Sequence, residues 1–187
     1  MNDPSITFPL ATGIVLASAC GFRVFIPPLI YSIAASLGWI ELSDSFLWLE
    51  SPWIRNIFIF ATLVEILGYL IPWVDNALDL IATPVSIFTG IAIVYISVDS
   101  LSPENQWLLA SIAGAPGAAI PQIGTSSLRA VSSAGTAGIA NPILSLVEDF
   151  SAIFLCLLAI LAPILGLIAI ASLFVFLIIR VARKIFT

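Results

Sequence analysis

The chain lacks histidine entirely, and charged residues make up only 9% of its 187 residues. Without histidine there are no imidazole proton relays, no histidine-ligated zinc or haem and no catalytic triad with a histidine base. Cysteine is also scarce. Cys20 and Cys156 lie far apart in separate apolar stretches, so neither a CxxC redox pair nor a thiolate metal site is indicated. We therefore expect no cofactor and interpret both cysteines as buried small apolar residues.

Basic residues are few as well, with six Lys and Arg against eleven Asp and Glu and a formal net charge of -5. They form no basic run or arm, which excludes nucleic acid as a partner. Hydrophobic residues make up 60% of the chain and the mean hydropathy is +1.16. A soluble protein of this composition could not bury all its apolar side chains in a core. The composition predicts an all-α integral membrane protein, with residues 1–187 forming a single transmembrane domain surrounded by membrane lipid.

The apolar stretches predict six transmembrane segments, because a hydrocarbon core about 30 Å thick needs roughly 20 helical residues. The N-terminal residues lack the positive n-region of a secretory signal, so the first segment is expected to be retained. The segments are 10–38, 56–71, 73–98, 106–123, 125–140, and a last one from 142 or 150 to 179.

Several segments carry residues that break or bend helices. The first contains Cys20-Gly21-Phe22-Arg23 and Pro27-Pro28. The fourth contains two glycines and two prolines between residues 114 and 121, so we expect it to be broken or re-entrant. The fifth is rich in small residues, which suit close helix contacts in a membrane. The last is long enough to tilt or to kink at Pro163.

Charge near the last segment predicts the orientation. Arg180, Arg183 and Lys184 follow it directly, so the positive-inside rule places the C-terminus in the cytoplasm. Six crossings would then place the N-terminus there too, with the loops around Glu41 and Asp99 on the other side. The 39–53 loop carries three tryptophans and is interpreted as an interfacial cap.

Seven ionisable side chains lie inside or at the edge of the apolar segments. A charge near the middle of a bilayer costs roughly 2.5 to 3.5 kcal/mol on insertion scales, so such groups persist where they pair, line a wet cavity or act in function. The pattern predicts a hydrated polar interior at mid-depth. The seven residues are Arg23, Glu65, Asp75, Asp79, Arg129, Glu148 and Asp149.

The third segment carries a polar stripe near its start. Asp75, Asp79 and Thr83 are four residues apart and share one helix face, with Asn76 on the flank. For Asp75 the simpler alternative is that it, or Asn76, caps the helix. Asp79 lies too deep for capping, so we assign it a functional role.

Glu65 is flanked by apolar residues and must be protonated, paired or hydrated. A buried carboxylate of this kind can couple solute movement to protons; the alternative is a static ion pair with Arg23 or Arg129. Both arginines need a carboxylate, several carbonyls or an anionic ligand, because a guanidinium cannot shed its charge.

Glu148 and Asp149 point about 100° apart on a helix, so one is expected to face the cavity while the other reaches solvent or caps a turn. A faint internal repeat favours Asp149 as the residue that faces the cavity. The interval from Pro142 to Asp149 is the same as the interval from Pro72 to Asp79. The repeat would make residues 1–100 and 101–187 inverted halves, as in many secondary transporters, although chance recurrence in an apolar chain is an equal alternative.

The chain resembles the uncharacterised bacterial membrane family called domain of unknown function 4126. The likeness rests on residues 19–27, on Pro72-Trp73-Val74-Asp75 with Asp79, and on Ala140-Asn141-Pro142 with Ser145, Glu148 and Asp149. Glu65 and Arg129 also fall where the family carries a glutamate and an arginine. Members of the family often have a lysine shortly after the glutamate and a histidine after the second aspartate. At those places this chain has Gly68-Tyr69-Leu70 and Ala82-Thr83 instead. The resemblance implies a polytopic fold in a bacterial plasma membrane and these site residues, Asn141 included, but no activity.

We expect a small channel or secondary carrier for a small ion or solute, proton- or cation-linked, and not an enzyme. Five acids against two arginines favour protons or cations as the solute. One alternative is an intramembrane enzyme acting on lipid or a small amphiphile, with Asp79 and Glu65 as acid and base. The other is a structural or assembly subunit that binds helices through its fourth and fifth segments. Homo-oligomers are compatible with so small a transporter.

Overall fold

The computed structural model describes residues 4–71 and 74–186, with side chains described for 6–71, 74–175 and 179. Throughout these residues the chain is helical and contains no strand, which confirms the predicted all-α class. In chain order the elements are α1 (Pro4–Cys20), α2 (Ile26–Ser36), the 3₁₀ helix η1 (Asp44–Glu50), α3 (Pro52–Tyr69), α4 (Val74–Ser97), α5 (Pro103–Leu109), the π-helical turn η2 (Ala110–Gly114), α6 (Ala115–Thr136), α7 (Asn141–Leu161) and α8 (Pro163–Phe186).

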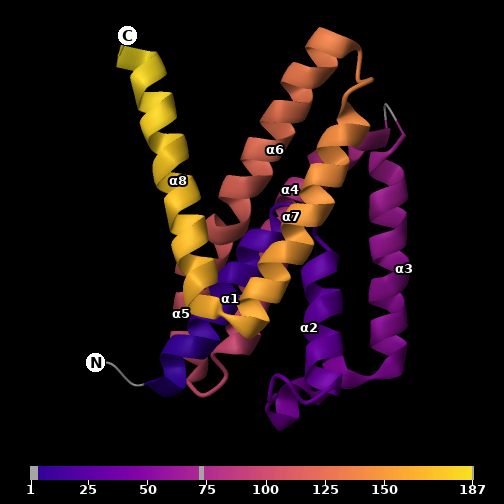
Figure 1. The fold of residues 1–187 in the computed structure, drawn as a ribbon. Coiled ribbons are helices and arrows are strands. Elements are labelled where there is room, and N and C mark those ends of the chain that lie inside the picture. Colours follow the sequence, from indigo (N-terminus) through magenta and orange to yellow (C-terminus); the bar gives the residue numbers. More distant parts are fainter. Residues whose placement is uncertain (1–3, 72–73, 187) are drawn as a thin grey trace.

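The first predicted segment is a helical hairpin and does not cross the bundle. In Figure 1, α1 rises from the N-terminal end, stops part-way, and α2 runs back toward the same end. Pro27 and Pro28 lie in the first turn of α2, where a missing N–H removes no helical hydrogen bond. Gly21 lies directly against α6, because a Cβ there would collide with the Ala118 carbonyl oxygen. We call residues 21–25 the hairpin tip.

The fourth and fifth predicted segments are one continuous helical run, α5–η2–α6, so the expected re-entrant break is wrong for this part of the chain. The π-helical turn absorbs the irregularity: it covers Ala110–Gly114, and Pro116 follows in the first turn of α6. Pro121 lies inside α6 without ending it. A chain reversal within a predicted segment does occur in the molecule, but in the first segment.

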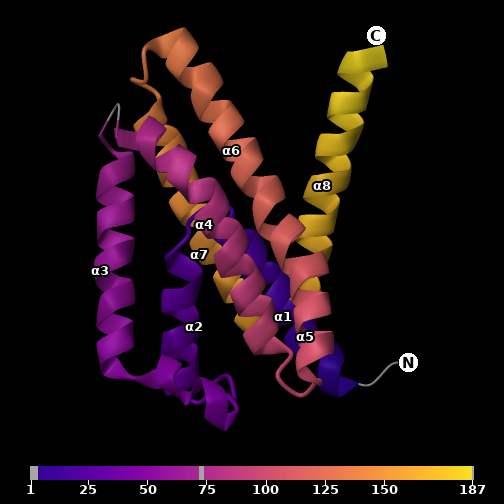
Figure 2. The same cartoon turned by 180° about the vertical axis from the view of Figure 1, so that it is seen from behind.

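The last predicted segment is two helices. α7 ends at Leu161, α8 begins at Pro163, and Ala162 between them is not helical. Pro163 has no N–H to donate to an earlier carbonyl, which favours a break at this point. Figures 1 and 2 show α8 diverging from α6 and α7, and the two chain ends at opposite ends of the bundle. Six crossings would have placed both ends together, and the first segment's return accounts for the difference.

α1 forms the centre of the bundle, in contact with α2, α4, α6, α7 and α8. It is apolar on all sides, and residues from Val15 to Cys20 are buried to 1% exposure or less. A helix that is hydrophobic all round is expected to be enclosed by others. Because α1 leads directly to the hairpin tip, this enclosure fixes the tip in the interior.

By length and composition, two helices of the described part are long and apolar enough to cross a membrane: α4 and α7. Residues 72 and 73, where one predicted segment ends and the next begins, lie outside the described residues, as do the side chains of Arg180, Arg183 and Lys184. The predicted half-repeats stay a prediction. Residues 1–100 form the hairpin and two long helices, whereas 101–187 form one interrupted helix and two more.

α4 crosses the π-helical turn with glycine on both sides. A Cβ on Gly114 would lie 2.6 Å from the Gly90 carbonyl oxygen, and one on Gly90 would lie 2.8 Å from the Gly114 carbonyl oxygen. Such contact between backbones is typical of small residues where helices pack in membranes.

We predict that Gly114→Ala lowers the thermal unfolding midpoint of the detergent-solubilised protein, because main chain must move to admit the methyl group. Gly124→Ala on the same helix is the matched control, since nothing lies within 4 Å of its added Cβ. The control should keep or raise the midpoint, because Ala is favoured over Gly in a helix by about 0.5–1 kcal/mol. Equal midpoints for the two variants would contradict the glycine crossing.

Candidate functional site

Arg23 projects from the hairpin tip onto one face of α7. Its Nε donates to Asp149 Oδ1 and its Nη1 lies 3.1 Å from Glu148 Oε2. Its Nη2 donates to the Ser145 hydroxyl at 2.6 Å and to the Ser145 carbonyl oxygen at 3.0 Å. The side chain is 1% exposed. Glu148 and Asp149 point about 100° apart on α7, and the guanidinium group is broad enough to contact both. Both acids therefore face inward, whereas the sequence predicted that only one of them would.

Arg129 on α6 shares the same carboxylate. Its Nε donates to Glu148 Oε1 at 3.1 Å and its Nη2 donates to Glu148 Oε2, the oxygen that Arg23 also contacts. Its Nε also lies 4.0 Å from Asp79 Oδ1. Arg129 is 1% exposed, like Arg23. Glu148 is therefore the bridge that joins the hairpin tip, α6 and α7.

Tyr69 at the end of α3 packs against both arginines. The guanidinium carbon of Arg23 lies 4.3 Å from the centre of its ring and that of Arg129 lies 4.2 Å away. Its hydroxyl donates to Asp79 Oδ1 at 3.1 Å. Stacking on an aromatic face stabilises a guanidinium that has left water. Tyr69 thus links the two cations to Asp79 on α4.

Glu65, one turn before Tyr69 on α3, holds the hairpin tip by its main chain. Its two carboxylate oxygens accept the N–H groups of Val24 at 2.7 Å and Phe25 at 3.0 Å, immediately before α2 begins. A carboxylate is stabilised by the free N–H groups and the dipole of a helix N-terminus. In the described part of the chain no guanidinium lies within 4.0 Å of Glu65, so the alternative of a static ion pair is wrong.

Asp75 and Asn141 connect the starts of α4 and α7. Asp75 Oδ2 accepts the Asn141 amide at 2.5 Å, and the same amide donates to the Ser133 hydroxyl at 2.9 Å. Asp75 Oδ1 accepts the main-chain N–H of Asn76 at 2.7 Å, in keeping with the capping alternative. Asp75 and Asn141 are both 1% exposed. The Asn76 residue itself is exposed, and only its backbone takes part.

Asp79 lies one turn below Asp75 and is less enclosed than its neighbours, with a side-chain exposure of 15%. Its described side-chain partners are the Tyr69 hydroxyl and the distant Nε of Arg129. Thr83 shares its helix face, but the Thr83 hydroxyl donates to the Asp79 main-chain carbonyl at 3.2 Å. Asp79 is thus the acid of the network that is paired most weakly, and Thr83 is not a ligand of it.

The structure therefore brings together eight of the ten predicted site residues and leaves out the side chains of Asn76 and Thr83. We call these eight, with Tyr69 and Ser145, the charge network: Arg23, Glu65, Tyr69, Asp75, Asp79, Arg129, Asn141, Ser145, Glu148 and Asp149. It holds five carboxylates against two guanidiniums. Among the described residues no group of His, Cys, Asp or Glu has the arrangement of a metal site.

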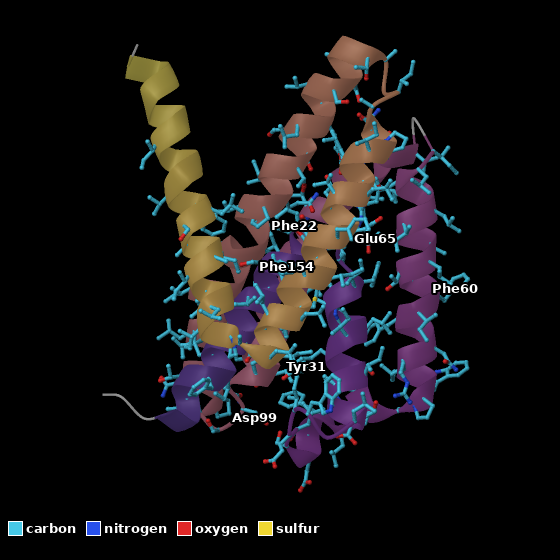
Figure 3. The ribbon with its side chains drawn as sticks, viewed as in Figure 1. Phe22, Tyr31, Phe60, Glu65, Asp99 and Phe154 are labelled. Atoms are coloured by element: carbon cyan, nitrogen blue, oxygen red, sulfur yellow. The ribbon has the colours of Figure 1, made fainter. Side chains whose placement is uncertain are left out.

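None of four well-formed cavities of the described residues is lined by the buried charges as a group, although one of them borders Glu65 and Tyr69. A cavity of about 530 Å³ lies at the opposite end of the bundle and is lined by Tyr31, Glu41, Ser97 and Asp99 among others. Figure 3 shows Tyr31 and Asp99 at that end and Glu65 well above them. An apolar groove of about 280 Å³ runs past Glu65 and Tyr69 on the outer side of α3 and α4. None of these four cavities corresponds to the predicted pocket enclosed by all seven charges.

The sequence interpretation missed Tyr69 and Ser145 as members of the network. Spacing carried a signal for both: Tyr69 lies four residues after Glu65, and Ser145 lies three before Glu148 and four before Asp149, so each shares a helix face with a selected acid. The main-chain donors of Val24 and Phe25 had no such signal, because only the reversal at the hairpin tip exposes them.

A family model described as Domain of unknown function (DUF4126) matches residues 10–184, nearly the whole chain. This match confirms the resemblance predicted from the three motifs. Neither the curated proteins nor the solved structures contain a match to the chain.

We predict that Arg23→Gln destabilises the protein by about 3–5 kcal/mol, because it leaves the buried Asp149 without its cation. Arg23→Lys should recover part of this loss, since one ammonium cannot reach all the partners of the guanidinium fork. The readout is the unfolding midpoint in detergent. The control is Arg55→Gln, because the exposed Arg55 donates to the Ser36 hydroxyl at the end of the bundle and lies outside the charge network. A similar loss in the control would argue against a special role for Arg23.

We predict that Glu65→Gln loosens the hairpin tip. The carboxylate has one oxygen for each of the N–H groups of Val24 and Phe25, whereas an amide has only one acceptor oxygen. Hydrogen exchange at residues 22–26 should speed up while the centre of α7 stays protected. Glu104→Gln, on the exposed start of α5, should leave exchange at the tip unchanged. Unaltered exchange in Glu65→Gln would show that the carboxylate does not hold the tip.

Proposed function

Because the chain belongs to the DUF4126 family, whose description names no activity, we propose from its geometry that it is a small membrane-embedded carrier of protons or small cations. The observation that carries the proposal is the composition of the charge network: five carboxylates held against two guanidiniums in the interior of an apolar bundle.

The placement of charge supports a membrane as the surroundings. Large apolar side chains are exposed along α3, α4, α6 and α7, including Phe60 at 69%, Leu80 at 83%, Phe88 at 72% and Phe150 at 72%. The buried charges are those of the network. A soluble monomer rarely exposes so extensive an apolar surface, whereas lipid-facing helices require it. We therefore place the long helices across a bilayer, with the hairpin re-entering from one side.

Several charged residues outside the network lie at the end of the bundle at which the hairpin opens: Glu41 and Asp99 line one cavity there, and Arg55 lies near the start of α3. In the sequence, Arg180, Arg183 and Lys184 fall within the C-terminal part of α8. By the positive-inside rule we propose that this end faces the cytoplasm, and we take the membrane to be a bacterial plasma membrane. The N-terminus lies on the other side, because the hairpin does not cross.

The surplus of carboxylates supports protons or cations as the solute. With all groups ionised, the network carries three more negative than positive charges. Charge of one sign inside an apolar medium is strongly disfavoured, so the network must take up protons or a cation. Asp79 is the best placed acceptor, because its neighbours are each held by a guanidinium, an amide or main-chain N–H groups.

The hairpin tip supports a carrier whose access can change. Arg23 and Glu65 fasten the tip to two different helices, α7 and α3, through side chains whose charges the solute would alter. Broken helices whose ends meet near the middle of the membrane are typical of secondary transporters. Binding of a proton or cation among the acids would weaken these fastenings, since it competes with the guanidinium and N–H donors.

The intramembrane enzyme is the second candidate, and the groove beside Glu65 is the observation in its favour. This groove is apolar, about 280 Å³, and open on its outer side, as an acyl chain would need. Glu65, however, uses both oxygens on main-chain N–H groups and is poorly placed as a base. The structural-subunit alternative is also weakened, because Gly114 and Ala118 pack inside the chain against α4 and α1.

We predict that purified protein in liposomes dissipates an imposed pH gradient or cation gradient, and that Asp79→Asn lowers the rate at least about tenfold, because it removes the most available charge of the network. A luminal pH dye and cation-sensitive dyes measure the two fluxes separately. Asp99→Asn, in the far cavity, is the matched control and should keep most of the rate. Rates for folded Asp79→Asn equal to those of the wild type would reject the mechanism.

A further inference from the structure

One face of α6 is polar from its middle to its C-terminal end. Gln122, Ser126, Arg129 and Ser133 recur at intervals of three and four residues, with Ser132 beside them. Gln122 donates to the Ser126 hydroxyl at 3.1 Å, and Ser133 accepts the Asn141 amide of α7 at 2.9 Å. The polar face therefore turns inward toward α7, with lipid-type residues such as Val131 on the outside, 72% exposed.

Three buried polar atoms where α6 faces α7 have no hydrogen-bond partner among the described residues: Arg129 Nη1 and Ser132 Oγ on α6, and Asn141 Oδ1 on α7. Arg129 and Asn141 are both only 1% exposed. A buried donor or acceptor without a partner costs about 1–3 kcal/mol, more for a charged group, so such atoms in native proteins normally hold water. The trio combines a donor, a hydroxyl and an acceptor, which matches what water molecules bind and does not match a bare cation or anion.

Two of these atoms belong to the charge network itself, since Arg129 and Asn141 are members of it. Ser132 lies outside the network, one turn after Arg129 and closer to the end of the bundle where α6 meets α7. The next turn of α6 carries Thr136, which is exposed and whose hydroxyl accepts the Ala140 N–H at 3.2 Å. Polar groups thus continue from the interior to the surface at this end.

The opposite direction is apolar. Leu16, Cys20, Ile26 and Ile93 belong to one buried cluster that also includes Tyr31, at exposures of 3% or less. This cluster lies between the hairpin tip and the large cavity around Tyr31 and Asp99. The cavity of about 320 Å³ that Phe25, Tyr31 and Ile93 line in this direction is apolar as well, so on this side the network borders apolar groups only.

We infer that a file of water molecules, held by Arg129 Nη1, Ser132 Oγ and Asn141 Oδ1, connects the charge network to the end where α6 meets α7 and admits protons from that side alone. The inference rests on the proposed function for its solute and gives that function a direction of access. Water molecules with two to four polar partners each can hand protons along such a file, whereas a dry apolar cluster cannot.

The test is the reaction of single cysteines with a membrane-impermeant methanethiosulfonate reagent in proteoliposomes whose orientation is known from cleavage of a C-terminal tag. Cys20 and Cys156 are fully buried, so the wild type is the blank. We expect Ser132→Cys to react from the C-terminal side at least about tenfold faster than Val131→Cys, because a wet thiol ionises and a lipid-facing one does not. Ser133→Cys provides a second position if Ser132→Cys fails to fold.

Two outcomes overturn the inference: cysteines at 132 and 133 that react no faster than the one at 131, or reaction from the N-terminal side only. The labelling does not depend on transport, so the two proposals fail separately. Labelling without flux in the wild type would support the water file and reject the carrier. Flux in the wild type with unreactive cysteines would reject the water file alone.

Discussion

Two guanidinium groups, each 1% exposed inside an apolar helical bundle, impose the constraint that orders the rest of the molecule. Arginine cannot lose its proton, and the effective penalty for burying an ion in a protein is several kcal/mol, so every donor needs a partner. α7 supplies a carboxylate pair and a serine, α3 supplies an aromatic face, and α4 supplies Asp79. The rotation of three helices about their axes is thereby fixed by two side chains.

Close backbone contact complements this polar network. Gly21 meets the main chain of α6, and Gly90 meets Gly114 where α4 crosses the π-helical turn. In the membrane setting proposed above, apolar burial gives little direction among the helices, so small residues and polar bonds would decide which helices pair. The position of Arg23 depends on both kinds of contact. Gly21 lets the hairpin tip approach α6, and Glu65 then binds the tip from α3.

The sequence was sufficient to predict an all-helical chain and most of the residues that meet inside it. Ionised side chains in apolar stretches must pair with one another or be hydrated, so their positions indicate which residues come together. The sequence was insufficient to predict where the chain reverses its direction between helices. No polar turn separates α7 from α8, and Pro163 alone does not distinguish a kink from a reversal. Pro27 and Pro28, expected to interrupt a crossing, instead begin a returning helix. Thr83 has the right spacing, but its hydroxyl donates to the main-chain carbonyl of Asp79 in the same helix, which periodicity cannot reveal.

The distance along the chain between the partners of the hairpin tip has a consequence for biosynthesis. Arg23 precedes Ser145 by 122 residues and Asp149 by 126. A ribosome adding about 5–20 residues per second makes α7 many seconds after the tip has emerged. Until then the arginine has no carboxylate from α7. The final contacts of the N-terminal hairpin therefore form only after most of the chain has been made, and they depend on its C-terminal third.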